Sequence, residues 1–316
     1  MRNFFRHKPR EVVNPPKQTV AELVKLLEAA KAEEAATSEA DKGVVYKRAV
    51  LIGINYFGTS SELNGCVNDV HNVYVWLTKE CGYDAKNIQI LTDERDSAVR
   101  PTRANIEKAM KWLNSDLPAN VPVQLFLHYS GHGSWTYDQS AGTAGAGDEA
   151  DGRDESICPV DYNTAGCIID DDLNKLIVVP IAEMANVSMT CLFDCCHSGT
   201  ALDLRYDYEI DVNGATPTTR TYKMIQQKSL QKTKSQIMLW SGCLDSQTSA
   251  DAYIARQSQG AMTWGFLSTV RKNKNVLSYK KLLSELQLQL KSARYEQIPH
   301  FSCSKMVNLA DRAVLF

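Results

Sequence analysis

The chain has 316 residues, of which 44% are hydrophobic and 23% are charged, a composition typical of a soluble globular protein. Its 35 basic and 37 acidic side chains leave a net charge of -2, which argues against nucleic acid as the main partner. No apolar run approaches the roughly 18 residues of a membrane-spanning helix, so we expect no contact with a membrane.

The first 43 residues differ in composition from the rest of the chain and are expected to form an N-terminal arm. Thr19–Glu22 has the pattern of a capping box, and the apolar residues around it recur at helical spacing, which predicts a short helix. A mitochondrial targeting peptide is the alternative for this basic start. The early Glu11 and the absence of serine before Ser38 argue against it.

From residue 44 onward, short β-rich runs alternate with helical patterns. We expect strands at residues 48–55, 87–92, 123–129, 189–194 and 236–240, and helices at 70–79, 102–115 and 278–294. Thr102 is the expected N-cap of the second helix. The alternation predicts one α/β domain over residues 44–316, with an open, mostly parallel β-sheet and helices on both faces.

Two stretches interrupt this alternation, and both are predicted to be mobile surface segments. Residues 137–153 are rich in Gly, Ala and Asp. Residues 204–235 are polar, show no clear apolar period and carry several basic residues, among them Arg220, Lys223, Lys228, Lys232 and Lys234. The second stretch is interpreted as a linker between residues 44–203 and 236–316.

The nine cysteines are an odd number and include no Cys-x-x-Cys pair, which argues against a zinc ribbon or a thioredoxin-type site. The first ten residues carry charge but lack the apolar stretch of a secretory signal. We therefore expect a reducing compartment, the cytoplasm or the nucleus.

A histidine and a cysteine follow two of the predicted strands. In an open parallel sheet, ligands bind beyond the carboxyl ends of the strands, and both His132 and Cys196 fall there. A thiol becomes a nucleophile when a base is near, and the N–H groups of Gly133 and Cys196 could bind an oxyanion. Alone, each would be interpreted as a structural turn histidine or a buried thiol; together they favour a catalytic pair. A metal site at Cys195–His197 lacks the usual ligand spacing.

Several longer motifs resemble those of type I metacaspases, which are caspase-like cysteine peptidases. The two that would carry the catalytic pair are His128–Gly133 and Phe193–Gly199. The likeness continues through Leu51–Gly58, Leu63–Asp69, Ile157–Asp161, Ile168–Asp172 and Ser241–Asp251 and covers roughly residues 46–310.

The resemblance implies a caspase-like fold, with residues 44–203 and 236–316 in the places of the large and small caspase subunits. It implies an endopeptidase in which His132 and Cys196 form the dyad and a thioester is the intermediate. Autocatalytic cleavage, a monomeric state and a part in programmed cell death are also implied.

The same resemblance places Asp69 and Asp194 in a specificity pocket that accepts Arg or Lys. Cys66 and Ser130 would lie near this pocket, and Ser241 would line it. The chemistry agrees, because two carboxylates in a partly desolvated pocket suit a guanidinium or an ammonium group. On its own, Asp194 could equally cap the turn that follows its strand.

Residues 148–172 contain nine carboxylates and one basic residue, Arg153. Such a run is usually a solvated face, but Asp170–Asp172 directly follows an apolar run, and oxygen ligands at this density suit calcium. The spacing is not that of an EF-hand. The resemblance implies activation by Ca²⁺, with Asp154, Asp170, Asp171 and Asp203 as ligands.

Two rival functions use the same residues differently. A non-proteolytic scaffold, or a factor that binds aggregates, could keep the fold, but the presence of both dyad residues favours the peptidase. A redox sensor built on the adjacent Cys195 and Cys196 is disfavoured because neighbouring cysteines form strained disulfides.

Overall fold

A computed structural model describes residues 44–137, 153–195, 201–210, 222–227, 230–242, 251–254, 257–293, 295 and 297–313. The predicted N-terminal arm, nearly all of the Gly-rich stretch and Cys196 lie outside the described residues. The described residues from Val45 onward belong to one structural unit.

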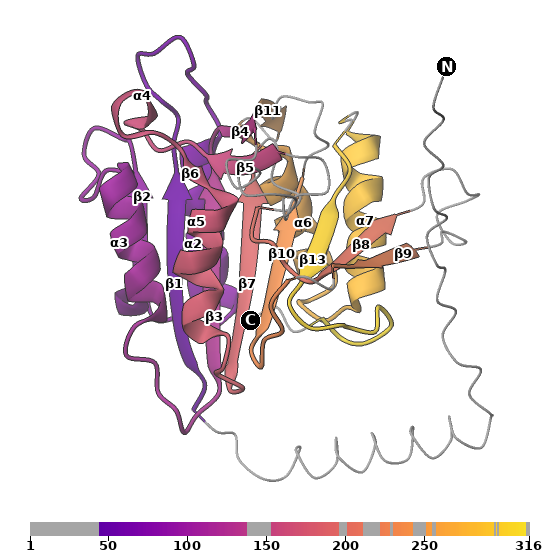
Figure 1. Ribbon diagram of the computed structural model, residues 1–316. Helices are drawn as coiled ribbons and strands as arrows, with labels where there is room; N and C mark the ends of the chain where they lie inside the picture. Colours follow the sequence, from indigo (N-terminus) through magenta and orange to yellow (C-terminus); the bar gives the residue numbers. More distant parts are fainter. Residues whose placement is uncertain are drawn as a thin grey trace, which may run out of the picture. The chain divides into compact units, whose positions relative to one another are not determined.

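An eight-stranded sheet with the order β2-β1-β3-β7-β10-β13-β8-β9 lies at the centre of this unit (Figure 1). Neighbouring strands from β2 to β10 pair in parallel, and β13, β8 and β9 continue the sheet with antiparallel pairs. The strands are β1 (Tyr46–Gly53), β2 (Ile88–Thr92), β3 (Val123–Ser130), β7 (Val187–Asp194), β8 (Tyr206–Ile210), β9 (Tyr222–Gln226), β10 (Gln236–Ser241) and β13 (His300–Cys303).

Two small sheets and a set of helices complete the described fold. β4 (Gly133–Tyr137), β5 (Arg153–Ile157) and β6 (Ile168–Ile169) form one small sheet, and β11 (Asp251–Ile254) pairs with β12 (Gln257–Gly260) in the other. The helices are α2 (Cys66–Glu80), α3 (Arg103–Asn114), α4 (Tyr162–Ala165), α5 (Asp170–Ile177), α6 (Ala261–Lys272) and α7 (Tyr279–Ser292), with short 3₁₀ turns at Ala85–Asn87 and Val179–Ile181.

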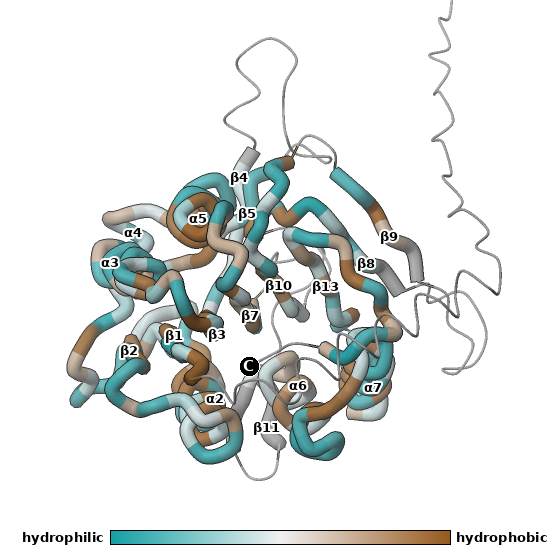
Figure 2. The backbone as a smooth tube through the Cα atoms, turned by 90° about the horizontal axis from the view of Figure 1, so that it is seen from below, coloured by the Kyte–Doolittle hydropathy of each residue, from teal (hydrophilic) through white to brown (hydrophobic). Residues whose placement is uncertain are grey.

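Helices cover both faces of the central sheet, and each face has its own apolar core. Successive side chains of β1 point to opposite faces: Val50 packs in the cluster that includes residues of α3 and α5, whereas Leu51 packs in the cluster of α2, α6 and α7. Figure 2 shows these two groups of helices on opposite sides of the row of strands. Full burial of each such side chain contributes about 1.5–3 kcal/mol. The predicted α/β fold class is confirmed.

The predicted start of a helix agrees with the structure where the N-cap residue itself supplies the capping side chain. Thr102 Oγ1 accepts a hydrogen bond from Asn105 N–H at 3.3 Å, so α3 begins where it was predicted. In contrast, α2 begins at Cys66, four residues before the predicted start. Its N-cap is Gly65, which has no side chain, and Asn55 Oδ1, beyond the end of β1, accepts from Cys66 N–H at 3.0 Å instead.

The prediction for residues 204–235 is wrong where the structure describes them. Instead of lacking regular structure, they include β8 and β9, and β8 pairs with β13 inside the central sheet. Tyr208 is buried, and its ring lies 5.4 Å from that of Phe301. Because the strand that pairs with β8 lies far along the chain, the local pattern of residues could not reveal it.

Within the described ranges, no helix is both long enough and apolar enough to cross a membrane.

Candidate active site

The carboxyl ends of β1, β3 and β7 lie side by side and bring several predicted site residues together. In the parallel register, Gly53 is the partner of Ser130, and Ser130 is the partner of Asp194. His132 follows β3, and Cys195 directly follows β7. The segments that carry the predicted dyad therefore leave neighbouring strands at one edge of the sheet. Cys196 itself lies outside the described residues.

One hydrogen bond and one ring contact orient the imidazole of His132. Its Nε2 lies 2.8 Å from the carbonyl oxygen of Ser61, and since a carbonyl can only accept, Nε2 must carry the proton of this bond. In the neutral ring, Nδ1 is then the atom that can take up a proton. The backbone N–H of His132 donates to Tyr56 Oη at 3.0 Å, and the two rings lie 4.7 Å apart.

Two buried tyrosines support the backbone around His132. Tyr56 Oη donates to the carbonyl of Cys158 at 2.6 Å, and Tyr129 Oη donates to the carbonyl of His132 at 2.7 Å. Burial raises the pKa of both phenols well above the usual value, so both remain protonated donors. Tyr56 has a φ of 52°, a conformation that few non-glycine residues adopt.

The glycine before His132 is explained by the same tyrosines. A Cβ atom at Gly131 would lie 2.7 Å from Tyr129 Oη and 3.1 Å from Tyr56 Oη. Any side chain would displace the hydroxyls that hold His132. Tyr56 and Tyr129 were not predicted as site residues from the sequence. The signal that could have indicated them is a tyrosine, with its polar hydroxyl, at the end of each of two otherwise apolar predicted strands.

The carboxylates of Asp69 and Asp194 meet at the start of α6. Asp69 is fully buried; it accepts from Gly260 N–H at 2.9–3.0 Å and from Ser130 Oγ at 2.7 Å. Asp194 Oδ2 accepts from Thr263 N–H at 2.7 Å. A Cβ atom at Gly260 would lie 2.2 Å from Asp194 Oδ2 and 2.6 Å from Asp69 Oδ2.

This arrangement explains how two acidic groups can be buried together. The N-terminus of a helix carries partial positive charge and exposed N–H groups, which stabilise nearby anions. Asp194 thus accepts a hydrogen bond at the N-terminus of a helix, α6, which lies far along the chain from its own strand.

Cys66 and Ser241 lie at the same edge of the sheet. The carbonyl oxygen of Cys66 would be 2.5 Å from a Cβ atom at Gly53, the residue paired with Ser130. Ser241 ends β10 opposite Phe193, one residue before Asp194. Ser241 is buried, and its Oγ has no hydrogen-bond partner among the described residues. All five predicted pocket residues therefore lie at one edge.

The predicted calcium ligands lie in β5 (Asp154), at the start of α5 (Asp170 and Asp171) and in the segment beyond β7 (Asp203). Asp170, at the start of α5, accepts from Glu155 N–H at 2.6 Å and from Asp171 N–H at 2.8 Å. Burial raises its pKa to about 6, and the charges of Asp154 and Asp171 contribute. Carboxylate oxygens are ligands that suit a hard cation, and such a cation would reduce the repulsion between these three negative charges.

The geometry of the predicted calcium set does not enclose an ion. No group of three or more His, Cys, Asp or Glu side chains in the described parts of the chain is arranged to hold a metal. Asp171 Oδ2 forms an ion pair with Lys175 Nζ at 3.0 Å. Asp203 has a φ of 47°, a left-handed backbone between the buried residues Leu202 and Leu204.

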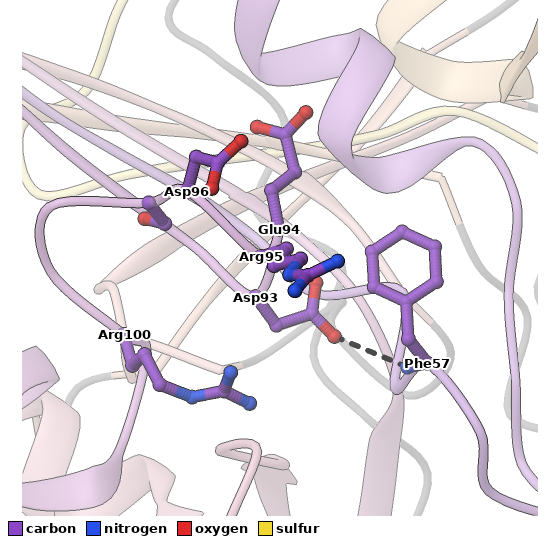
Figure 3. A pocket seen from close by; sticks show the side chains of 7 residues that line it. Phe57, Asp93, Glu94, Arg95, Asp96 and Arg100 are labelled. Atoms are coloured by element: carbon purple, nitrogen blue, oxygen red, sulfur yellow. Dashed lines mark hydrogen bonds between the residues drawn. The ribbon is translucent and has the colours of Figure 1, made fainter.

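A cavity of about 710 Å³ lies beyond the carboxyl end of β2 and is separate from these residues. Its lining is mostly charged and consists of Phe57, Asp93, Glu94, Arg95, Asp96, Ser97 and Arg100. Figure 3 shows these lining side chains and the hydrogen bond in which Phe57 N–H donates to Asp93. None of the predicted site residues lines it.

Comparison with known proteins decides the family. The family model "Metacaspase, peptidase C14 domain" matches residues 47–205. Metacaspase-1A of Neosartorya fischeri is 38% identical to this chain over 82% of its length, and Metacaspase-1 of Kluyveromyces lactis is 38% identical over 83%. The chain belongs to the metacaspase family.

This metacaspase spans 65% of the length of the Neosartorya fischeri relative and 67% of the Kluyveromyces lactis relative. Its fold is also similar to a crystal structure of a Geobacter sulfurreducens protein, with a TM-score of 0.56 and 23% identity. That match covers 85% of this chain and 98% of the other. At this identity the likeness concerns the fold alone.

Proposed function

We propose that this metacaspase is a cysteine endopeptidase that uses His132 and Cys196. The observation that carries the proposal is the bond between His132 Nε2 and the Ser61 carbonyl, because it leaves Nδ1 as the basic atom of a fixed ring. The chain segment after β7, which bears Cys196, leaves the strand next to the one that precedes His132.

The reaction then follows the general scheme of acyl transfer. His132 takes the proton of the Cys196 thiol, and the thiolate attacks the scissile carbonyl carbon. His132 returns the proton to the leaving amine, which departs and leaves a thioester on Cys196. Water, deprotonated by His132, hydrolyses the thioester. The N–H groups of Gly133 and Cys196 bind the oxyanion, a contribution of about 3 kcal/mol per donor.

The buried carboxylates support specificity for Arg or Lys. Both carboxylates approach Gly260, where a Cβ atom would lie 2.2 Å from Asp194 Oδ2 and 2.6 Å from Asp69 Oδ2. The Ser130 hydroxyl donates a hydrogen bond to Asp69. A guanidinium can bridge two such carboxylates, and a carboxylate substrate would be repelled. The preferred substrates are therefore peptides and proteins with an exposed basic residue.

We also propose activation by calcium, with Asp154, Asp170, Asp171 and Asp203 as ligands that would have to move together from the positions they have in the structure. The raised pKa of Asp170, caused by burial and by the charges of two neighbours in this set, supports a cation here. Calcium supplies positive charge that would join the small sheet to the segment after β7. The chemistry of cleavage uses only the protein side chains.

One assay tests the function. The full chain is given matched fluorogenic peptides ending in Arg, Lys or Asp, with calcium or with chelator. We expect turnover of the Arg and Lys peptides only, dependent on calcium. Cys196→Ala should abolish turnover, whereas the matched variant Cys195→Ala should keep most of it. No turnover by a folded protein would favour the non-proteolytic scaffold, and equal cleavage after Arg and Asp would exclude the pocket.

A further inference from the structure

Two cysteines outside the proposed dyad face each other across the small sheet. Cys158 follows β5 and Cys167 precedes β6, and their sulfur atoms lie 3.3 Å apart. Cys158 is buried, and Cys167 is partly exposed. Neither residue belongs to the pocket or to the proposed calcium set.

The register of the small sheet makes this pair a cross-strand pair. Ser156 is opposite Ile169 and Ile157 is opposite Ile168 in the antiparallel ladder. One further step along both chains places Cys158 directly opposite Cys167. Directly opposed residues have Cα atoms about 4.5–5.5 Å apart, within the range of about 4.4–6.8 Å that a disulfide spans. The sulfurs need to approach by roughly 1.2 Å to reach bonding distance.

The surroundings of Cys167 favour its thiolate. The pKa of Cys167 is lowered to about 7, chiefly by the hydrogen bond with the Cys158 thiol and further by Ser156 and the Arg103 guanidinium. Arg103 Nη1 also donates to the Cys167 carbonyl at 2.7 Å, which keeps the cation beside the thiol. A thiolate that is partly exposed and lies next to a second thiol is the arrangement that oxidants attack.

We propose that Cys158 and Cys167 form a reversible disulfide in response to a hydroperoxide. The Cys167 thiolate attacks the peroxide oxygen, and with one proton it forms a sulfenic acid and releases water or an alcohol. The Cys158 thiol then attacks the sulfenic sulfur, and a second oxygen leaves as water. The two thiols together lose two electrons, which reduce the O–O bond of the peroxide. A thiol reductant restores the pair by exchange.

The disulfide would act on the backbone that holds His132. Cys158 N–H donates to the His132 carbonyl at 3.0 Å, and the Cys158 carbonyl accepts from Tyr56 Oη. The disulfide would therefore link Cys158, whose N–H binds the His132 carbonyl, to Cys167, the residue that precedes β6. The alternative is that the two thiols pack merely as small apolar groups, which needs neither the opposed register nor the lowered pKa.

The pair can be tested on a single peptide. Trypsin cuts after Arg153 and Lys175 and at no residue between them, so both cysteines lie in the peptide 154–175. The full chain is treated with a small excess of hydrogen peroxide, alkylated without reductant and digested. We expect this peptide to lose two hydrogens and to resist alkylation, and glutathione should restore both thiols. Cys81, buried and with a pKa raised by burial to about 12, is the internal control that stays reduced.

Cys167→Ser separates the disulfide from other oxidation. In this variant Cys158 should remain a thiol under the same treatment. A second readout is amide exchange at Cys158, which should slow by a factor of about three or more on oxidation of the unchanged chain and not in the variant. Two alkylated thiols after treatment, or a link from either residue to a different cysteine, would overturn the proposal.

Discussion

Asp69 and Asp194, one on α2 and the other at the end of β7, bind backbone N–H groups three residues apart at the start of α6. Asp69 accepts from Gly260 and Asp194 accepts from Thr263. The same helix start thus holds in place the two carboxylates that we propose as the specificity pocket. A shift of α6 would therefore also move the two charged groups of the proposed pocket.

The first prediction concerns Gly260, whose missing side chain lets the two carboxylates approach. In Gly260→Ala the new Cβ atom would lie 2.2 Å from Asp194 Oδ2, so at least one carboxylate must move. We expect kcat/KM for Arg peptides to fall by a factor of about ten or more, since a charge-assisted contact contributes about 1.5–3 kcal/mol. Steady-state kinetics and a thermal melt measure the two effects separately.

Gly265→Ala is the matched control for this variant. It lies in the same helix, where a Cβ atom would meet the Leu286 Cδ1 methyl at 2.7 Å and no carboxylate. We expect it to lower the melting temperature with little change in kcat/KM of the remaining folded enzyme. If both variants lose activity only in proportion to stability, the pocket assignment is wrong.

The second prediction concerns Tyr56, which we interpret as a positioning residue. Tyr56→Phe removes the hydroxyl that accepts from His132 N–H and donates to the Cys158 carbonyl. His132 would lose part of its support, and we expect kcat to fall by about tenfold with KM nearly unchanged. Tyr83→Phe is the control, because the buried Tyr83 hydroxyl has no hydrogen-bond partner among the described residues. A change in KM alone would contradict this role.

The third prediction concerns calcium and uses thermal stability, not activity. Calcium should raise the melting temperature of Cys196→Ala protein, since a ligand that binds only the native state stabilises it. Asp170→Asn in the same background should reduce this rise. Asp172→Asn should keep it, because Asp172 belongs to an ion pair with Arg103 and not to the proposed ligand set. If magnesium raised the melting temperature equally, or if calcium did not raise it, the proposal of a calcium site would be wrong.

The fourth prediction concerns the lowered pKa of Cys167. A pKa of about 7, against the usual 9.0, means that the thiolate dominates above neutral pH and is lost as pH falls below about 7. The rate of alkylation of Cys167 in reduced protein should therefore rise with pH and level off above about pH 8. Cys158→Ala removes the largest cause of the shift and should move this profile to higher pH. A midpoint near the usual value in the unchanged chain would refute the assignment.

Much of the fold and the edge that carries the site could be predicted because the signals are local. Apolar runs located the parallel strands, and the position of His132 after β3 indicated the edge. Other relationships depend on residues far apart in sequence. Gly260 meets Asp69 and Asp194 only after α6 packs against the sheet, and Tyr56 reaches His132 only after β1 and β3 pair. The cysteine pair depends on the register of β5 and β6, which no local pattern encodes.

The fifth prediction concerns self-cleavage within residues 204–235, where caspases are processed into two subunits. A protease cuts a segment that can extend into the active site free of its own backbone hydrogen bonds. A segment paired in a β-sheet must first break these bonds. Lys223 lies within β9 opposite Glu209, and Lys234 binds the Ala182 carbonyl through its N–H and Glu183 through its Nζ at 2.8 Å. Cuts after Lys223 or Lys234 should therefore be slow.

Two sets of variants decide where the chain is cut and whether the cut matters. Lys223→Gln with Lys234→Gln should still be cleaved in calcium, because Arg220, Lys228 and Lys232 remain. Replacing Arg220, Lys223, Lys228, Lys232 and Lys234 together with Gln leaves only the buried Arg205 as a basic residue in this segment. This variant should give one band on a gel and should keep peptide turnover within a factor of about two of the unchanged chain, since the proposed dyad and pocket are intact. Mapping the cut to Lys223 would disprove the argument from strand pairing. A folded but inactive five-residue variant would show that cleavage activates the enzyme, because only the processing sites differ.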